Sequence, residues 1–159
     1  MKKYSLMIGL SVALFLSRGA WAGDYVADFN GDKPGAEPAA FAPVVGVWRV
    51  GLEKDNKVFM VDGGKWKEGE ASAGLADKAR ALYGERYAEF LDNVKTYAYF
   101  PLAVARDVAD FREGEISVRF KPLDGRIDQG AGIAFNLKEN GDYLVLRANA
   151  LENNLVLFK

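Results

Sequence analysis

Short apolar-rich segments, bounded by turns that contain Gly, Asn or Asp, recur along this chain in a pattern that is typical of β-strands. The first half predicts a strand at Val44–Val50 and its partner at Lys57–Val61, with a turn at Lys54-Asp55-Asn56 between them. The second half predicts four further strands, at Phe111–Phe120, Gly130–Leu137, Tyr143–Ala148 and Leu155–Phe158. Short turns join neighbouring strands, and the strongest turn signal is Asn140-Gly141. We therefore predict an all-β (mainly β) fold: antiparallel sheets packed as a sandwich.

One segment, residues 73–94, breaks this pattern. Its apolar residues recur at steps of three and four, as on the buried face of an amphipathic helix: Leu75, Ala79, Leu82, Tyr83, Tyr87, Phe90, Leu91 and Val94. Gly84 weakens this helix by up to about 1 kcal/mol relative to alanine. We predict a single helical insertion whose aromatic stripe is a packing face; a ligand-binding stripe is the alternative.

The N-terminus has the three parts of a secretion signal. Met1-Lys2-Lys3 is basic, Tyr4–Leu16 is apolar, and Ala20-Trp21-Ala22 has the small-x-small pattern of a cleavage site. The apolar run is shorter than the roughly 20 residues of a membrane-spanning helix. We predict a signal peptide over residues 1–22 and a mature domain over 23–159, in the periplasm or outside the cell, with no membrane contact after cleavage. An uncleaved anchor or a buried helix is the alternative.

The amino-acid composition excludes several kinds of catalytic and binding site. The 159-residue chain has no histidine and no cysteine, which excludes Ser-His and Cys-His catalytic pairs and the usual zinc ligands. Cleavage after Ala22 leaves 18 basic against 22 acidic side chains, a net charge of about −4. This balance predicts no nucleic-acid partner.

A turn-like segment near the start of the mature domain carries alternating oxygen donors. Asp28, Asn30 and Asp32 are candidate calcium ligands. The full twelve-residue calcium-loop pattern is absent, and a simple turn is the alternative. We therefore predict no cofactor, with calcium kept as a possible ligand of this segment.

The C-terminal strands enclose a polar run, Arg147–Asn154. Alternation along the preceding strand places Tyr143, Val145, Arg147 and Asn149 on one face, and the apolar Leu144, Leu146 and Ala148 on the other, which we expect to be the core side. An aromatic ring beside a guanidinium and amides suits a sugar, which stacks on the ring and hydrogen-bonds through its hydroxyls. In the alternative arrangement, Arg147 pairs with Glu152 and the asparagine side chains cap the turn. The candidate ligand-binding residues are Tyr143, Arg147, Asn149, Glu152, Asn153 and Asn154.

The same residues carry a resemblance to a known family. Asp128-Gln-Gly-Ala-Gly-Ile-Ala-Phe135 and the run from Asn140 to Lys159, with Arg-Ala-Asn-Ala-Leu-Glu-Asn-Asn at its centre, resemble secreted bacterial domains of the 3-keto-disaccharide hydrolase-like group, in the concanavalin A-like lectin/glucanase superfamily. The segments Phe29–Pro38 and Gly46–Val50 are similar to the start of such domains. The resemblance covers roughly residues 27–61 and 111–159.

The resemblance implies a two-sheet jelly-roll sandwich with a concave carbohydrate-facing surface. It carries a family role over to Arg147, Asn149 and Glu152, the positions that match the motif. The chain departs from the family in two places. Residues 73–94 are an insertion, and similar domains continue past the position of Lys159 with further strands. We therefore expect a shortened member or a fragment.

Three functions are compatible with these residues. The first is a secreted carbohydrate-recognising domain that binds a saccharide on the polar sheet face. The second is a glycoside-processing hydrolase, which normally needs two carboxylates about 5–9.5 Å apart. The candidates are Glu152, paired with Asp128 or Asp142, and the pair Glu113 and Glu115 on one strand face. The third is a non-catalytic structural protein of the envelope. Whether the chain is an enzyme stays open at this point.

Overall fold

The computed structural model describes residues 24–65, 67, 70–98, 100–108 and 111–159. This part of the chain is mainly β, and all its strand pairs are antiparallel. The strands are β1 (Phe41–Val45), β2 (Trp48–Glu53), β3 (Asn56–Val61), β4 (Leu102–Ala105), β5 (Gly130–Phe135), β6 (Leu144–Asn149) and β7 (Asn154–Phe158). They form the pairs β1–β4 and β2–β3 and the sheet β5–β6–β7. The predicted antiparallel, mainly β class is confirmed, and its packing is consistent with a sandwich; the jelly-roll topology stays a prediction.

The strand predicted at Val44–Val50 is two strands. Val44 and Val45 belong to β1, and the chain turns at Gly46, whose φ of 87° is the left-handed conformation that glycine adopts at least cost. β2 then begins at Trp48 and pairs with β3, from Trp48 opposite Val61 to Glu53 opposite Asn56. The predicted partner strand is thus confirmed. The prediction missed the turn because apolar residues flank Gly46 on both sides.

The segment predicted as one helix is helical but interrupted. It comprises α1 (Leu75–Tyr83), the 3₁₀ turn η2 (Gly84–Arg86), α2 (Tyr87–Asp92) and α3 (Val94–Tyr97), and a separate 3₁₀ turn, η1 (Gly63–Lys65), precedes it. The break falls at Gly84, with φ of 59° and ψ of −133°, a conformation outside the helical region. The apolar side chains keep their helical spacing across Gly84. The helix nevertheless ends there, because the glycine adopts a conformation in which the chain turns.

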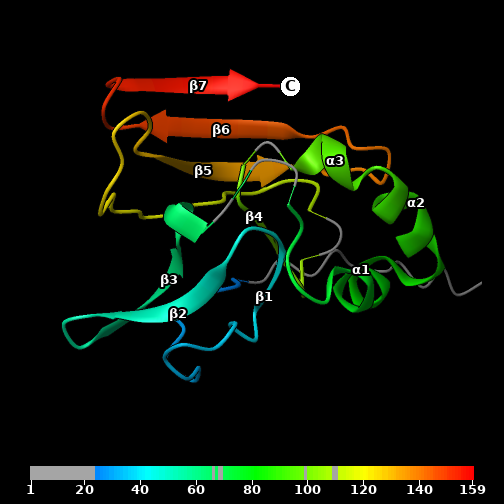
Figure 1. Ribbon diagram of the computed structural model, residues 1–159, viewed down its shortest axis with the longest axis horizontal. Coiled ribbons are helices and arrows are strands. Elements are labelled where there is room, and N and C mark those ends of the chain that lie inside the picture. Colours follow the sequence, from blue (N-terminus) through cyan, green and yellow to red (C-terminus); the bar gives the residue numbers. More distant parts are fainter. Residues whose placement is uncertain (1–23, 66, 68–69, 99, 109–110) are drawn as a thin grey trace, which may run out of the picture.

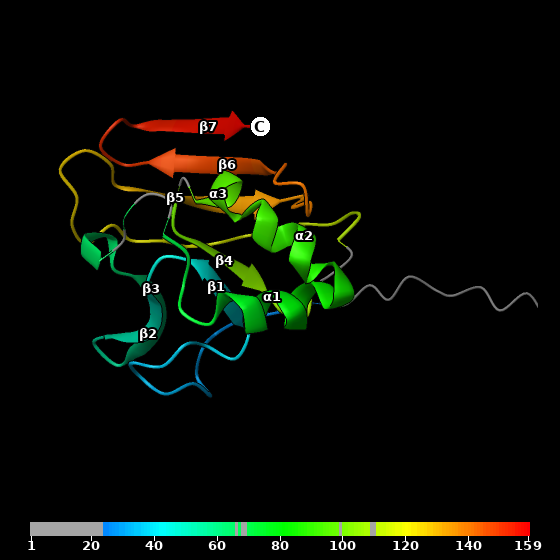
Figure 2. The same cartoon turned by 45° about the vertical axis from the view of Figure 1, so that its right-hand side comes forward.

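The core lies between these helices, β1 and one end of the C-terminal sheet. Its buried cluster comprises Val44, Val45, Leu75, Ala79, Phe90, Tyr97 and Ala98. Neighbouring rings connect the helices to the sheet, since Phe90 lies between Tyr83 and Tyr97, and Tyr97 stacks on Tyr143 of the sheet with a centroid distance of 6.0 Å. Figure 2 shows α2 and α3 beside the ends of β5 and β6, and α1 in front of β1. The predicted packing role of the aromatic stripe is confirmed.

The strand predicted at Phe111–Phe120 is wrong, because the described residues of this segment pair with no strand and are exposed. Exposed apolar side chains there include Ile116, Val118 and Phe120. Beyond it, Lys121 forms an ion pair with Glu53 at the tip of the β2–β3 hairpin. Alternating apolar and polar side chains form a strand only where a neighbouring strand supplies backbone hydrogen-bond partners. The local sequence does not show whether such a neighbour is present.

The C-terminal sheet matches its prediction closely. β5 pairs with β6 from Gly130 opposite Asn149 to Phe135 opposite Leu144, and β6 pairs with β7 from Val145 opposite Phe158 to Asn149 opposite Asn154. Lys138 and Asp142 close the predicted hairpin loop, where Gly141 has a φ of 94°. Figure 1 shows this sheet at one end of the molecule, with β7 on its outer edge and the β2–β3 hairpin at the other end.

Our assignment of the core side of this sheet is wrong. Tyr143, from the face that we expected to be polar and outward, packs against the core cluster, whereas Leu146 of the opposite face is 38% exposed. Alternation correctly predicts which residues share a face. It could not identify the covered face, because the helices of the insertion pack on the Tyr143 side.

Candidate functional site

A hydrogen-bonded cluster of polar side chains surrounds the β6–β7 turn. We call it the polar turn cluster; its members are Asp128, Arg147, Asn149, Glu152 and Asn154. Asn149 is its buried centre, only 2% exposed. Its side-chain oxygen accepts hydrogen bonds from the backbone N–H groups of Leu151 (3.1 Å) and Gln129 (3.3 Å), and its Nδ2 donates to Asp128 (2.6 Å). Asn149 therefore fastens the turn to the start of β5.

Arg147 lies across the sheet rather than pointing away from it. Its Nη2 donates to Glu152 at 3.2 Å, its Nη1 is 3.8 Å from Asp128, and its guanidinium carbon lies 5.2 Å from the centre of the Phe158 ring. Its aliphatic part passes over Gly130, where an added Cβ would be in van der Waals contact with its Cδ at 3.5 Å. Its Nε is buried with no hydrogen-bond partner among the described residues.

The structure shows the alternative arrangement for this polar run. Arg147 is paired with Glu152, Asn149 caps the turn, and Asn154 donates to Glu152 at 2.9 Å. Asn153 holds the last turn position with a φ of 49°, a left-handed conformation that asparagine tolerates. Five of the six candidate ligand-binding residues thus come together, and their first role is to hold the turn.

The sixth candidate, Tyr143, lies at the other end of β6. It lies six positions before Asn149, which corresponds to about 20 Å along a strand. Its ring stacks on Tyr97, whose hydroxyl oxygen accepts a hydrogen bond from the backbone N–H of Gly141 at 3.1 Å. The six candidates therefore form no single pocket; they mark two places on one sheet.

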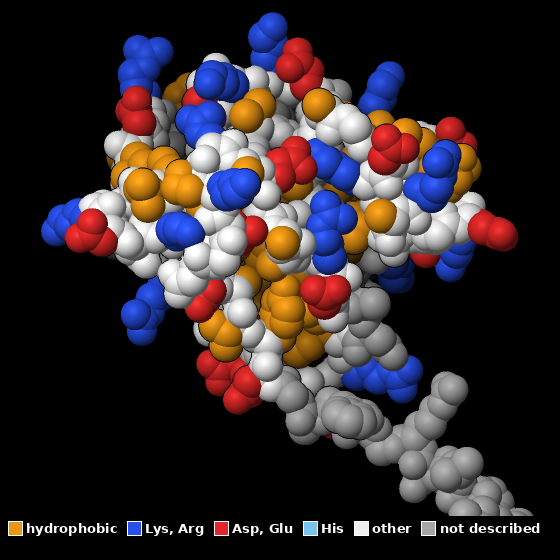
Figure 3. All heavy atoms as spheres, turned by 90° about the horizontal axis from the view of Figure 1, so that it is seen from below, with side chains coloured by type: hydrophobic (Ala, Val, Ile, Leu, Met, Phe, Trp, Pro, Cys, Tyr) orange, Lys and Arg blue, Asp and Glu red, His pale blue; other side chains and the backbone are white. Residues whose placement is uncertain are grey.

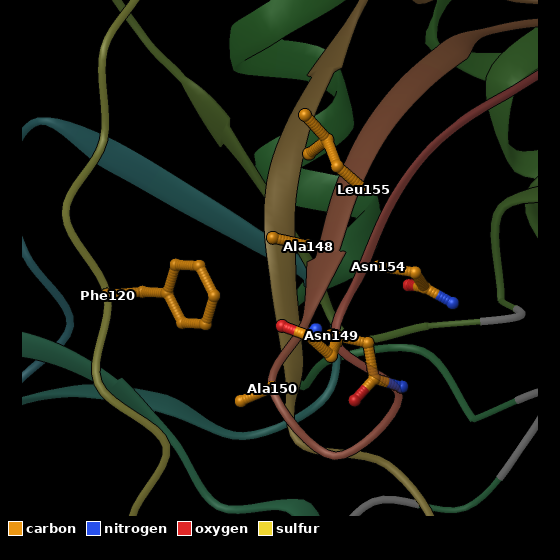
Figure 4. A pocket seen from close by; sticks show the side chains of 7 residues that line it. Phe120, Ala148, Asn149, Ala150, Asn154 and Leu155 are labelled. Carbon is orange, nitrogen blue, oxygen red and sulfur yellow. The ribbon is translucent and has the colours of Figure 1, made fainter.

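A shallow cavity of about 370 Å³ lies beside the polar turn cluster. We call it the turn cavity. Figure 4 shows the Phe120 ring facing Ala148 and the end of β6 across it. The turn residues Ala150, Asn153 and Asn154, together with Leu155, complete its lining. Phe120 was missed as a site residue because it was assigned to the apolar face of a strand that does not form.

A second, more enclosed cavity of about 320 Å³ lies at the Tyr143 end of the sheet. We call it the aromatic cavity. Its lining comprises Phe100, Gly141, Asp142, Tyr143, Val145, Phe158 and Lys159. Phe158 also lies beneath the Arg147 guanidinium, so the cavity adjoins the polar turn cluster on the same sheet face. Sequence reasoning found Tyr143 but missed Phe100 and Phe158, which come from two other segments.

Tyr97, which stacks on the cavity residue Tyr143, and the more distant core tyrosine Tyr83 are both neutral at physiological pH. Burial raises the pKa of Tyr97 to about 12, and burial likewise raises the pKa of Tyr83 above its ordinary value. The Tyr83 hydroxyl is buried with no hydrogen-bond partner among the described residues. Tyr97 therefore supports the cavity wall as an uncharged ring packed on Tyr143.

The candidate carboxylates fall in three separate places. Asp128 and Glu152 bind the same guanidinium, that of Arg147, so the structure brings this predicted pair together. Asp142 is at the opposite end of β6, where Asn140 donates to it at 3.0 Å, and it does not pair with Glu152. The pair Glu113 and Glu115 shares no strand face, because the segment is not a strand and Gly114 turns it with a φ of 135°.

The candidate calcium ligands form a hydrogen-bonded turn. Asn30 donates through its backbone and its side chain to Asp28, and Asp32 accepts from the backbone N–H of Ala39 at 2.9 Å. The Lys57 ammonium donates to the carbonyl oxygens of Asn30 (2.7 Å) and Asp32 (2.6 Å). A built-in cation therefore lies against the oxygens of this turn, and the search of the described residues found no group of three or more acidic side chains placed to hold a metal ion.

We expect Lys57→Met to lower the free energy of unfolding by about 1–2 kcal/mol, because two carbonyl oxygens lose a charged donor. Thermal unfolding measures this effect, and Lys33→Met, which changes an exposed lysine in the same region, is the matched control. Repeating both measurements with added calcium tests the calcium hypothesis. A rise in the unfolding temperature of the unaltered protein would show that the ion binds despite Lys57.

The surface charges and the helices of the described residues do not point to a further binding site. On the face seen in Figure 3, basic and acidic side chains are interspersed, with no extended patch of one sign. Among the described residues, no helix has the length and apolar composition needed to cross a bilayer. The predicted signal peptide, residues 1–22, lies outside the described residues.

Comparisons with known proteins do not assign a family or a function to these residues. No protein-family model matches the chain, and neither the curated proteins nor the solved structures that were compared with it gave a match. The functional argument therefore rests on the residues of the two cavities and the polar turn cluster between them.

Proposed function

We propose that this chain is a secreted carbohydrate-recognising domain that binds a saccharide in the aromatic cavity. The observation that carries the proposal is the lining of this cavity, which combines three aromatic rings, Phe100, Tyr143 and Phe158, with the polar side chains of Asp142 and Lys159. The resemblance to concanavalin A-like sandwich domains supports the same function. The proposal includes export by residues 1–22, so that the domain meets its sugar outside the cytoplasm.

This lining suits a sugar for two physical reasons. The apolar C–H face of a pyranose packs on aromatic rings, and Phe100 and Phe158 remain 45% and 40% exposed, which leaves ring surface for a ligand. A carboxylate and an ammonium at the rim supply an acceptor and donors to hydroxyl groups. Ligand sites commonly combine an apolar lining with a few polar groups in this way.

The polar turn cluster has a supporting role in this proposal. The side chains of Asn149 and Glu152 are engaged in bonds within the turn, and a sugar would have to break those bonds to use them. Arg147 instead lies against Phe158, a wall of the cavity. The cluster therefore orients the ring that the sugar contacts.

The carboxylates favour binding over hydrolysis at this cavity. A glycosidase normally places two carboxylic side chains across the scissile bond, whereas Asp142 is the one acidic side chain among the described residues that line the cavity. Asp128 and Glu152, beside the cavity rather than in its lining, are engaged in ion pairs with Arg147. The proposal is therefore a binding domain without turnover of its ligand.

The experiment is a glycan array on the purified protein, followed by calorimetric titration of the best-bound sugar. We expect Phe100→Ala to weaken binding about tenfold or more, since aromatic contacts contribute on the scale of 1.4 kcal/mol, which corresponds to a factor of about ten in the dissociation constant. Ile116→Ala, which truncates an exposed apolar residue outside both cavities, is the control. Equal affinities for the two variants, or an array without any bound glycan, would refute the proposal.

A further inference from the structure

The sheet register explains why aromatic rings gather in the aromatic cavity. Tyr143, just before β6, shares one face of the sheet with Val145 and Arg147. Phe158 of β7 lies opposite Val145, so it is diagonal to Tyr143 on one side and to Arg147 on the other. Phe100 adds a third ring from the segment between α3 and β4, and Figures 1 and 2 both show α3 at the end of the sheet where β6 begins.

These rings favour a cationic ligand over an anionic one. The face of an aromatic ring carries a negative potential and attracts an ammonium group within about 6 Å of its centre. Phe158 already shows this property, since the Arg147 guanidinium carbon lies 5.2 Å from the centre of its ring. Arg147 adds no net positive charge beside the cavity, because it is paired with both Asp128 and Glu152. The exposed ring surface of Phe100 and Phe158 therefore suits an ammonium group of a ligand.

Asp142 supplies a carboxylate to the same cavity. Its side chain accepts a hydrogen bond from the Asn140 amide at 3.0 Å, and its backbone N–H donates to the Asn140 side-chain oxygen at 3.1 Å. The backbone N–H of Lys138 donates to its carbonyl oxygen at 2.9 Å. Within the described part of the chain, no basic side chain pairs with this carboxylate. The hairpin loop therefore holds an unneutralised negative charge at the cavity.

The surroundings of Asp142 add further negative charge. Glu89 and Glu139 share a single cation, Arg86, whose guanidinium nitrogens lie 3.4 Å and 3.1 Å from their carboxylate oxygens. Burial is the main cause of the raised pKa of Tyr97, and the charges of Asp142 and these two glutamates raise that pKa further. The three carboxylates thus act together at the end of the sheet where the cavity lies.

Lys159 is the one basic residue among the described residues that line the cavity. Its side chain is exposed. A lysine ammonium on its flexible stem extends readily into water, whereas ring faces and the carboxylate of a hydrogen-bonded loop stay in place. Lys159 therefore opposes a bound ammonium group less than the rings and Asp142 attract it.

We propose that the saccharide bound in the aromatic cavity carries a protonated amino group, as an unacetylated 2-amino-2-deoxyhexose does. The ammonium group contacts the exposed ring surface of Phe100 and Phe158 and forms an ion pair with Asp142. This inference rests on the proposed function, because it names the class of sugar for the same cavity.

Calorimetric titration with matched oligosaccharides tests the preferred charge. Tetrasaccharides of β-1,4-linked glucosamine, N-acetylglucosamine and glucose differ only in the substituent next to the anomeric carbon, and an oligomer of glucuronic acid supplies the opposite charge. The titrations use slightly acidic buffer at physiological ionic strength, where the amino group is protonated and Asp142 is ionised. We expect the glucosamine oligomer to bind about tenfold more tightly than each of the others, the combined effect of a cation–π contact and an exposed ion pair.

A charge-removing variant tests the role of Asp142. Asp142→Asn keeps an acceptor oxygen for Asn140 and removes only the negative charge. We expect it to weaken binding of the glucosamine oligomer at least about threefold more than binding of the glucose oligomer. Glu115→Gln makes the same change of charge at an exposed position outside both cavities, and it should leave all affinities unchanged.

The outcomes separate this inference from the proposed function. If a glycan array shows binding, then equal affinities for the four oligomers, a preference for the glucuronic acid oligomer, or an equal effect of Asp142→Asn on the glucosamine and glucose oligomers contradicts the inference alone. An array without any bound glycan contradicts both.

Discussion

Truncation of Phe90 to alanine is expected to lower the free energy of unfolding by about 4 kcal/mol, the largest effect of any substitution that we consider. Phe90 is fully buried in α2, and its ring lies between those of Tyr83 (4.8 Å) and Tyr97 (4.9 Å). Removal of the ring leaves a cavity between Tyr83 and Tyr97, and Tyr97, which stacks on Tyr143, loses one of its packing partners. Denaturant unfolding followed by circular dichroism measures the loss.

The matched control for this prediction is Phe100→Ala, which removes the same ring from an exposed position. We expect it to change the free energy of unfolding by less than about 1 kcal/mol while it weakens saccharide binding. The two variants therefore separate folding from function. A Phe90→Ala protein as stable as the unaltered one would show that the aromatic contacts of Phe90 with Tyr83 and Tyr97 do not hold the fold.

The second large effect is expected for Asn149→Ala, at about 3 kcal/mol. This substitution leaves the backbone N–H groups of Leu151 and Gln129 without their acceptor, and it removes the donor to Asp128. Unsatisfied groups in a buried place are more costly than the hydrogen bonds themselves are worth. The midpoint of thermal unfolding should fall by about 10 °C for a domain of this size.

Two further variants sharpen that prediction. Asn154→Ala removes an exposed amide with one hydrogen bond in the same cluster, to Glu152, and is expected to cost less than about 0.5 kcal/mol. Asn149→Asp keeps the acceptor oxygen but places a second carboxylate 2.6 Å from Asp128, so it should be nearly as harmful as alanine. If Asn149→Ala and Asn154→Ala were equally stable, the polar turn cluster would not hold the turn.

The sequence was most informative where local signals agree with each other. In the C-terminal sheet, alternation and the Asn140-Gly141 turn both specify a hairpin, and β5, β6 and β7 follow within one or two residues of their predicted bounds. At Gly46 and Gly84 the apolar pattern of side chains continues but the strand or helix does not, since a glycine with a positive φ redirects the backbone. The pattern of side chains alone could not show those turns.

Tertiary packing explains the remaining errors. The segment around Ile116–Phe120 has the side-chain pattern of a strand but pairs with no neighbouring edge in the described structure. The covered face of β6 depended on where the helices pack, and the stack of Tyr97 on Tyr143 decides it. Both outcomes depend on contacts between residues that are distant in sequence.

The candidate site was predicted in part for the same reason. The turn residues from Arg147 to Asn154 are close in sequence, and the structure brings them together as a cluster. The aromatic cavity combines Tyr143 with Phe100, from the segment after α3, and Phe158, from β7. Alternation along one strand could identify Tyr143 but not the two rings that complete the wall.

The central claim is that a saccharide binds in the aromatic cavity, and amide chemical-shift mapping by NMR tests it most directly. Titration of the best-bound sugar into isotopically labelled protein should shift the amide signals of Gly141, Asp142, Tyr143 and Phe158 together, with saturation at one site. The amides of the β2–β3 hairpin should not move. Shifts that are confined to the β6–β7 turn and Phe120, or the absence of any saturable shift, would contradict the account.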